Sequence, residues 1–140
     1  MAGYKPSTST IPVQESRHTV YLDAGITQQH VGHAVTVVTG NTDLTVKLAA
    51  DDDVVWGQLT TVEIPKNPND RAVGMVTVLG GYRLPCDPSI AFKIGDTVVG
   101  AGTGDNAGKV KKGAAASTDF RFFVSEIGAL ADGFVGVVKL

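Results

Sequence analysis

The sequence is poor in cysteine and in aromatic residues, and each shortage argues against a class of protein. Cys86 is the one cysteine among 140 residues, so no disulfide forms within the chain and the fold does not depend on an oxidising compartment. Aromatic residues make up 6% and do not alternate with basic ones, which argues against a surface that stacks nucleic-acid bases. No apolar run approaches the roughly 20 residues needed to cross a bilayer.

Charge is sparse as well. Charged residues make up 19% of the chain and the formal net charge is −2, so no strong attraction to nucleic acid or to anionic lipid is expected. The opening MAGYKPSTST has neither the basic nor the apolar region of a secretory leader. These features predict a soluble protein that accumulates in a cytoplasm and has neither a nucleic-acid nor a membrane partner.

Glycine, valine and threonine are plentiful, a composition that favours strands joined by tight turns. Leu44 to Leu48 alternates apolar and polar residues, and with 33–38 across Gly40-Asn41 it predicts a hairpin. Strand patterns recur with little helical period, which predicts a single mainly β domain over 17–140, either a β-barrel or a β-sandwich. The other expected strands cover 19–22, 54–64, 73–79, 96–101, 109–112, 120–125 and 134–140, and short helical turns are expected at 87–92 and 125–130.

Residues 1–16 follow neither period and contain two prolines, which predicts an extended N-terminal arm. Two interpretations stay open, a frayed terminus and an arm that becomes ordered against a partner. Ordering costs about 1–2 kcal/mol per residue, so only a partner with matching pockets holds such an arm. The candidate contacts are the residues with apolar surface, namely Tyr4, Pro6, Ile11, Pro12 and Val13.

The stretch GAGTGDNAGKVKKG at 100–113 resembles a phosphate-binding loop but lacks its spacing. Val110 stands where the Ser or Thr of a Walker loop binds Mg²⁺, and no glycine completes a dinucleotide-binding pattern. A strand at 96–99, a glycine turn at 100–108 and a return strand from Lys109 form a hairpin instead. In that turn Gly102, Gly104 and Gly108 are expected to supply positive φ angles.

No group of residues predicts catalysis, a metal site or a cofactor. His30 and His33 lack a further ligand close in sequence, and Asp51 to Asp53 lacks the alternation of a calcium loop. Both are interpreted as surface loops. Cys86 follows Pro85 and precedes Asp87, whose carboxylate raises the pKa of a thiol and makes it a poor nucleophile. Lys109, Lys111 and Lys112 form a basic cluster, either a solvated hairpin end or a contact for an acidic protein surface.

Several motifs occur in an order that resembles a known family. They are Gly-His-Ala-Val at 32–35, Leu-Ala-Ala-Asp-Asp-Asp at 48–53, Val-Val-Trp-Gly-Gln-Leu at 54–59, Val-Gly-Met-Val-Thr-Val-Leu-Gly-Gly at 73–81, Ile-Gly-Asp-Thr-Val-Val-Gly at 94–100, Gly-Lys-Val-Lys at 108–111 and Gly-Phe-Val-Gly-Val-Val at 133–138. Over roughly residues 30 to 140 the chain resembles the small capsid decoration, or cement, proteins of tailed bacteriophages.

The resemblance implies a structural virion protein without catalysis or cofactor. It implies binding to the major capsid protein on the outer capsid surface, and self-association as a homotrimer in preference to a dimer. In several such proteins the N-terminal segment orders only on the shell, which agrees with an arm at 1–16. The alternative is a glycan- or receptor-binding β module on a phage head or tail. That module needs an exposed aromatic platform, whereas Trp56 lies among apolar residues that favour burial.

Overall fold

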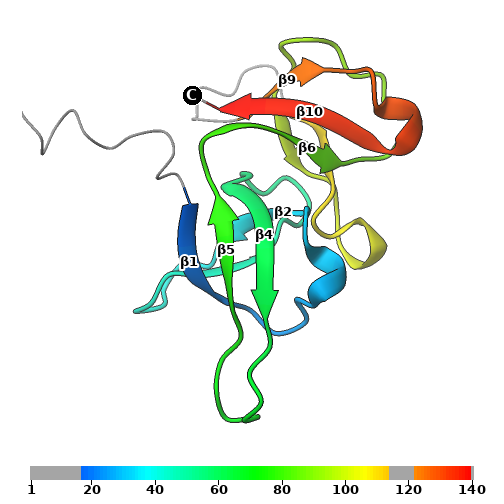
Figure 1. Cartoon of the computed structure of the whole chain (residues 1–140). Coiled ribbons are helices and arrows are strands. Elements are labelled where there is room, and N and C mark those ends of the chain that lie inside the picture. Colours follow the sequence, from blue (N-terminus) through cyan, green and yellow to red (C-terminus); the bar gives the residue numbers. More distant parts are fainter. Residues whose placement is uncertain (1–16, 114–121, 140) are drawn as a thin grey trace, which may run out of the picture.

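A computed structural model describes residues 17–113 and 122–139. This part of the chain contains ten strands and three short 3₁₀ turns, and Figure 1 shows them in two halves, one above the other. The strands are β1 (Arg17–Leu22), β2 (Ala34–Val37), β3 (Thr45–Leu48), β4 (Gly57–Glu63), β5 (Val73–Thr77), β6 (Gly80–Pro85), β7 (Val98–Gly100), β8 (Val110–Lys112), β9 (Phe123–Glu126) and β10 (Phe134–Lys139). The 3₁₀ turns are η2 (Gln28–His30), η3 (Gly104–Asn106) and η4 (Leu130–Asp132). None of the described helical turns is long and apolar enough to span a membrane.

The first half is a closed five-stranded barrel in the order β1-β3-β2-β4-β5. Each neighbouring pair is antiparallel except β1 with β3, which run parallel. Side chains that alternate along the strands fill the barrel, because successive residues of a strand point to opposite faces. The resulting first core consists of Val20, Leu22, Ile26, Val35, Val46, Leu59, Val62, Val76 and Val78.

The second half forms a more open ring around a core of its own. Antiparallel strands β6-β10-β9 make one sheet, and β7 with β8 makes another. An antiparallel bridge from Thr97 to Phe123 joins β7 to β9, and a parallel bridge from Cys86 to Val110 joins β6 to β8. Phe122 lies at the centre of this second core and is fully buried.

The two halves share one topology. β6 lies between β10 and β8, antiparallel to the first and parallel to the second, as β1 lies between β5 and β3. β7 pairs with β8 and bridges to β9, as β2 pairs with β3 and β4. In order, direction and partners, β6 to β10 repeat β1 to β5. The chain therefore contains an internal structural repeat of a five-stranded unit.

Irregular features of the two halves also coincide. The register of β4 shifts at Thr60 and that of β9 shifts at Ser125, and in each strand the residue before the bulge, Leu59 or Val124, is fully buried. A bulge inserts one residue and sharpens the local twist, so its position is specific to a fold. The same bulge at the same point in both halves supports the repeat independently of strand order.

Matching hydrogen bonds extend the repeat into the loops. Gly32 donates its amide to the carbonyl of Leu59 at 2.7 Å, and Gly95 donates to the carbonyl of Val124 at 2.8 Å. Both glycines have left-handed φ angles, +94° and +91°, which other residues adopt at a cost. In the return direction, Leu59 donates its amide to the carbonyl of His33 at 3.0 Å. Val124 donates in the same way to the carbonyl of Asp96 at 2.7 Å.

The halves are joined by packing and by backbone hydrogen bonds. Ala34, Ala49 and Val55 come from the first half but belong to the second core. Gly100 in β7 donates its amide to the carbonyl of Asp53 at 2.9 Å, and its own carbonyl accepts from the amide of Asp52 at 3.0 Å. Because one core draws on both halves, we expect them to unfold together.

The predicted mainly β architecture is confirmed, and the first half is a barrel. The hairpin predicted from 33–38 and 44–48 is confirmed as β2 and β3. The prediction missed β6, because none of the expected strands covers 80–85, where two glycines and a proline are typical of turns. Gly80 does have a positive φ of +100°, yet both glycines pair with β10. Proline is tolerated at Pro85 because it ends the strand.

Both predicted helical turns are wrong in place or in kind. A helical turn was expected over 87–92, but the carboxylate of Asp87 accepts from the amide and hydroxyl of Ser89, at 2.9 and 2.8 Å. This side chain closes a local turn after which the chain is irregular. The helical turn expected at 125–130 is replaced by the end of β9, and η4 begins only at Leu130.

The glycine stretch is a hairpin, as predicted. β7 and β8 are antiparallel partners, and the connection contains η3. Gly104 and Gly108 have positive φ angles of +59° and +82°. The same expectation for Gly102 was wrong, because Gly102 is not among the glycines with positive φ.

Candidate functional site

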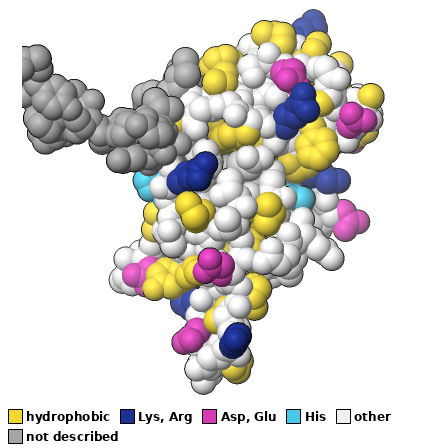
Figure 2. Space-filling view, viewed as in Figure 1, with side chains coloured by type: hydrophobic (Ala, Val, Ile, Leu, Met, Phe, Trp, Pro, Cys, Tyr) yellow, Lys and Arg dark blue, Asp and Glu magenta, His cyan; other side chains and the backbone are white. Residues whose placement is uncertain are grey.

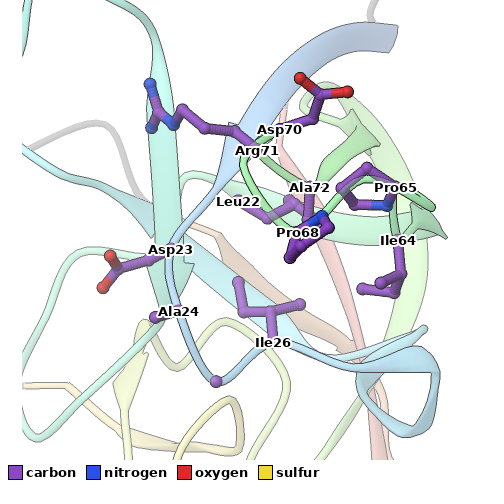
Figure 3. Close-up of a pocket in the computed structure, with 11 residues that line it drawn as sticks. Leu22, Asp23, Ala24, Ile26, Ile64, Pro65, Pro68, Asp70, Arg71 and Ala72 are labelled. Atoms are coloured by element: carbon purple, nitrogen blue, oxygen red, sulfur yellow. The ribbon is translucent and has the colours of Figure 1, made fainter.

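An open groove lies on the first half. It has a volume of about 460 Å³ and lies between the turn after β1 and the long β4–β5 loop. Figure 3 shows side chains from these two segments facing each other across it. Its lining residues are Leu22, Asp23, Ala24, Gly25, Ile26, Ile64, Pro65, Pro68, Asp70, Arg71 and Ala72.

The interior of the groove is apolar. Leu22 and Ile26 are buried members of the first core, each 5% exposed, and they line the groove from the β1 side. Ile64 faces them from the β4–β5 loop and is 57% exposed. An exposed isoleucine opposite core residues offers apolar surface that a bound side chain would remove from water. The groove therefore suits an apolar ligand group.

Carboxylates mark the rim of the groove. Among the described residues, neither Asp23 nor Asp70 forms an ion pair. The nearby Arg71 forms its ion pair with a different carboxylate, that of Asp43, at 3.7 Å. Its guanidinium also lies over the ring of Tyr21 at 4.2 Å and donates to the hydroxyl of Thr45 at 2.9 Å. Figure 3 shows this guanidinium directed away from the apolar interior. The rim thus favours a cation.

In the second half, the position that corresponds to the groove is filled by side chains of that same half. Ile90 follows Cys86 by the same interval as Ile26 follows Leu22, and the registers make Cys86 the equivalent of Leu22. There Leu130 of η4 packs against the second core together with Ile90. The β9–β10 connection is thus folded onto its half, whereas the longer β4–β5 loop leaves the groove open.

His30 and His33 lie in the loop before β2, as predicted, but both are partly buried, and Nδ1 of His33 is enclosed. The rings of His30 and His33 lie 5.4 Å apart between centroids, while His18 lies beside Trp56. Nδ1 of His30 accepts from the amide of Thr27 at 2.9 Å, so this histidine caps its own turn. Within residues 17–113 and 122–139, no three His, Cys, Asp or Glu side chains gather as metal ligands.

Cys86 is buried, and its environment keeps it protonated. Burial raises the pKa of the Cys86 thiol, the adjacent Asp87 carboxylate raises it further, and Lys109 acts in the opposite direction. The expected direction of the Asp87 effect is confirmed, although burial is the larger cause. A neutral thiol of this kind is a weak nucleophile.

The acidic run and the basic cluster bind each other. Lys111 forms ion pairs with Asp51 at 2.6 Å and with Asp52 at 3.1 Å. Lys112 pairs with Asp96 at 3.5 Å. Lys111 and Lys112 therefore have carboxylate partners within the chain, while a contact of the cluster with an acidic surface of another protein stays a prediction. Such exposed pairs contribute little to stability.

The remaining predicted site residues divide into two groups. Trp56 is half-buried, packs against the first core and has its ring centroid 5.8 Å from that of His18. Its ring is therefore not the fully exposed aromatic platform that a glycan-binding site needs. The five candidate contacts of the predicted arm lie outside the described residues. Figure 2 shows apolar side chains scattered among charged ones on the face it displays, without one continuous apolar patch.

Sequence reasoning missed the groove. Its apolar residues come from two loops about forty positions apart, and neither loop carries a motif. No protein-family model matches the chain, and no curated protein matches it.

Protonation of His33 gives a test of the packing between the halves. Burial lowers the pKa of His33 from its usual value of 6.5, and His30 lowers it further. Its Nδ1 is buried and lacks a hydrogen-bond partner among the described residues. The unfolded chain therefore binds the proton first, and stability is lost as pH falls through about 6.5 towards the lower folded pKa.

We expect the melting temperature of the wild type to fall more between about pH 7.5 and about pH 5.5 than that of His33→Gln. The carboxylates with lowered pKa, Asp87 and Asp96, have a usual value of 3.8 and titrate below this window. Thermal melts of both proteins across the range check this. An identical pH dependence would show that His33 is not the group responsible.

Proposed function

We propose that this protein is a capsid decoration protein that binds the outer surface of a bacteriophage capsid and stabilises contacts between major capsid subunits. The observation that supports it most is the open groove, with its apolar interior and with rim carboxylates, Asp23 and Asp70, that form no ion pair with another described residue. A surface of this kind suits an extended segment of protein. The order of motifs between residues 30 and 140, which resembles cement proteins, supports the choice of partner.

The physical action proposed is linkage. A ligand that binds the assembled shell, and not the separate subunits, stabilises assembly by mass action. One copy with a modest interface binds weakly, because association entropy offsets much of the burial energy. Self-association, as a trimer in preference to a dimer, raises the effective concentration of the remaining copies and multiplies avidity by about 10²–10⁴.

In this proposal the arm supplies part of the contact with the shell. Its apolar residues, among them Tyr4, Ile11 and Val13, lie in a segment that directly precedes β1. Among the residues that the structure describes, β1 is paired on the side facing β3 at Tyr21 and Leu22 alone. The first part of β1 therefore keeps a free edge, where an extended segment of another chain can add as a strand.

Deleting residues 2–16 is expected to weaken shell binding at least tenfold, equivalent to about 1.4 kcal/mol, because the apolar contacts of the arm are lost. Co-sedimentation with expanded and unexpanded capsids measures the effect. The matched control replaces Ser7 and Thr8 with alanine and keeps every apolar residue of the arm. Undiminished binding by a truncated protein with an unchanged melting temperature would contradict a role for the arm.

A further inference from the structure

We propose that the groove on the first half binds the N-terminal segment of this chain through Tyr4-Lys5-Pro6. The sequence order Tyr-Lys-Pro puts a large apolar side chain, a cation and a rigid residue at consecutive positions. Tyr4 matches the apolar interior of the groove, Lys5 matches its acidic rim, and Pro6 favours the extended backbone that fits a groove. This proposal concerns the free protein and goes beyond binding to a shell.

The internal repeat indicates what the groove lacks. In the second half, Leu130 and Ile90 both pack against the second core and Ala129 is only 7% exposed, so the loop after β9 covers its own core. In the first half, the matching loop contains Pro65 and Pro68 and lines an open groove beside Ile26. Because the two halves have the same topology, we infer that the first half is completed by an apolar side chain from a separate segment.

The charges of the rim select the segment. Asp23 and Asp70 have no ion pair within the described part of the chain. Lys5 is the one basic residue among residues 1–16, and it is flanked by Tyr4 and Pro6. A lysine between two apolar residues can place its ammonium at the rim while its neighbours enter the interior.

The length of the segment is sufficient. β1 covers Arg17–Leu22, so the start of β1 and the groove at its end are separated by about 17 Å along the strand. Residues 7–16 reach about 33 Å when extended, which allows Tyr4 to enter the groove of its own copy or of a neighbour. Pro6 restricts the segment before it binds and so reduces the entropy lost on docking.

Isoleucine methyl NMR of the full-length protein tests the proposal. The six isoleucines are Ile11, Ile26, Ile64, Ile90, Ile94 and Ile127. Replacing Tyr4 with alanine removes the aromatic ring next to the groove, so we expect the methyl signals of Ile26 and Ile64 to shift. Ile90 occupies the matching position in the second half and serves as the internal control, with an unchanged signal.

A second variant makes the test independent of one substitution. Lys5→Glu places a negative charge at the acidic rim, and we expect it to shift the same two signals by releasing the segment. A shift that grows with protein concentration indicates the groove of a neighbouring copy, and a concentration-independent shift indicates the same copy. Both results support the proposal.

Unmoved Ile26 and Ile64 signals in both variants would overturn it, as would a shift of all five described isoleucines alike. The outcome is separate from that of shell binding. Loss of shell binding on deleting the arm, together with unmoved groove signals, would leave the decoration function standing and exclude docking in the groove.

Discussion

Replacing Phe122 with alanine is expected to lower the free energy of unfolding by about 3–5 kcal/mol. The side chain is fully buried at the centre of the second core, and its ring centroid lies 5.2 Å from that of Tyr82. Its backbone carbonyl accepts from the amide of Val98 at 3.1 Å. Removing the ring leaves a cavity among side chains from several strands, and a cavity enclosed on all sides collapses poorly.

The adjacent Phe123 is the matched control, because it has the same side chain but begins β9 in a much more exposed position. It is 38% exposed, so Phe123→Ala is expected to cost about 1 kcal/mol or less. Urea unfolding of the two variants and the wild type compares them directly. Equal losses of stability would show that the second half is not built around Phe122.

The strands were predictable where alternation or turn chemistry was strong. Leu44 to Leu48 alternates clearly, and Gly40-Asn41 marks the turn before it, so the β2–β3 hairpin followed from the pattern. β6 was not predictable by the same rules. Gly80 and Gly81 suggest a turn, and only pairing with β10 holds them in a strand. Tertiary pairing overrides local preference at such positions.

The internal repeat was hidden because it preserves apolar character more than identity. Val20 corresponds to Leu84 and Leu22 to Cys86 by strand register, and all four are buried. A barrel interior accepts any apolar side chains of suitable total volume, so the two halves can diverge while the fold stays the same. The shared positive-φ glycine before each second strand is one position at which the residue itself is kept.

The candidate groove was hidden for another reason. Its interior is made by Ile26 and Ile64, which are ordinary apolar residues in the sequence. They become a site only because the turn after β1 and the β4–β5 loop leave the barrel at the same end, as Figure 1 shows. Strand order sets that geometry, and strand order cannot be read from a pattern of alternation.

Gly100→Ala is expected to destabilise the protein by about 3 kcal/mol. A Cβ at this position would lie 1.9 Å from the carbonyl oxygen of Ala50, and this contact is with backbone, which cannot rotate away. Gly100 also exchanges hydrogen bonds with the segment around Asp52 and Asp53, through which the halves are joined. Relief of the clash therefore requires separating β7 from the first half, and the melting temperature should fall by roughly 10 °C.

Gly128→Ala provides the control for this substitution. A Cβ at Gly128 meets no atom within 4 Å and the residue has no positive φ, so alanine there should change stability by less than about 0.5 kcal/mol. Thermal melts of the two variants and the wild type under one condition are sufficient. A melting temperature of Gly100→Ala equal to that of Gly128→Ala would mean that β7 does not lie against Ala50 as the structure has it, and that the two halves are not joined at this point.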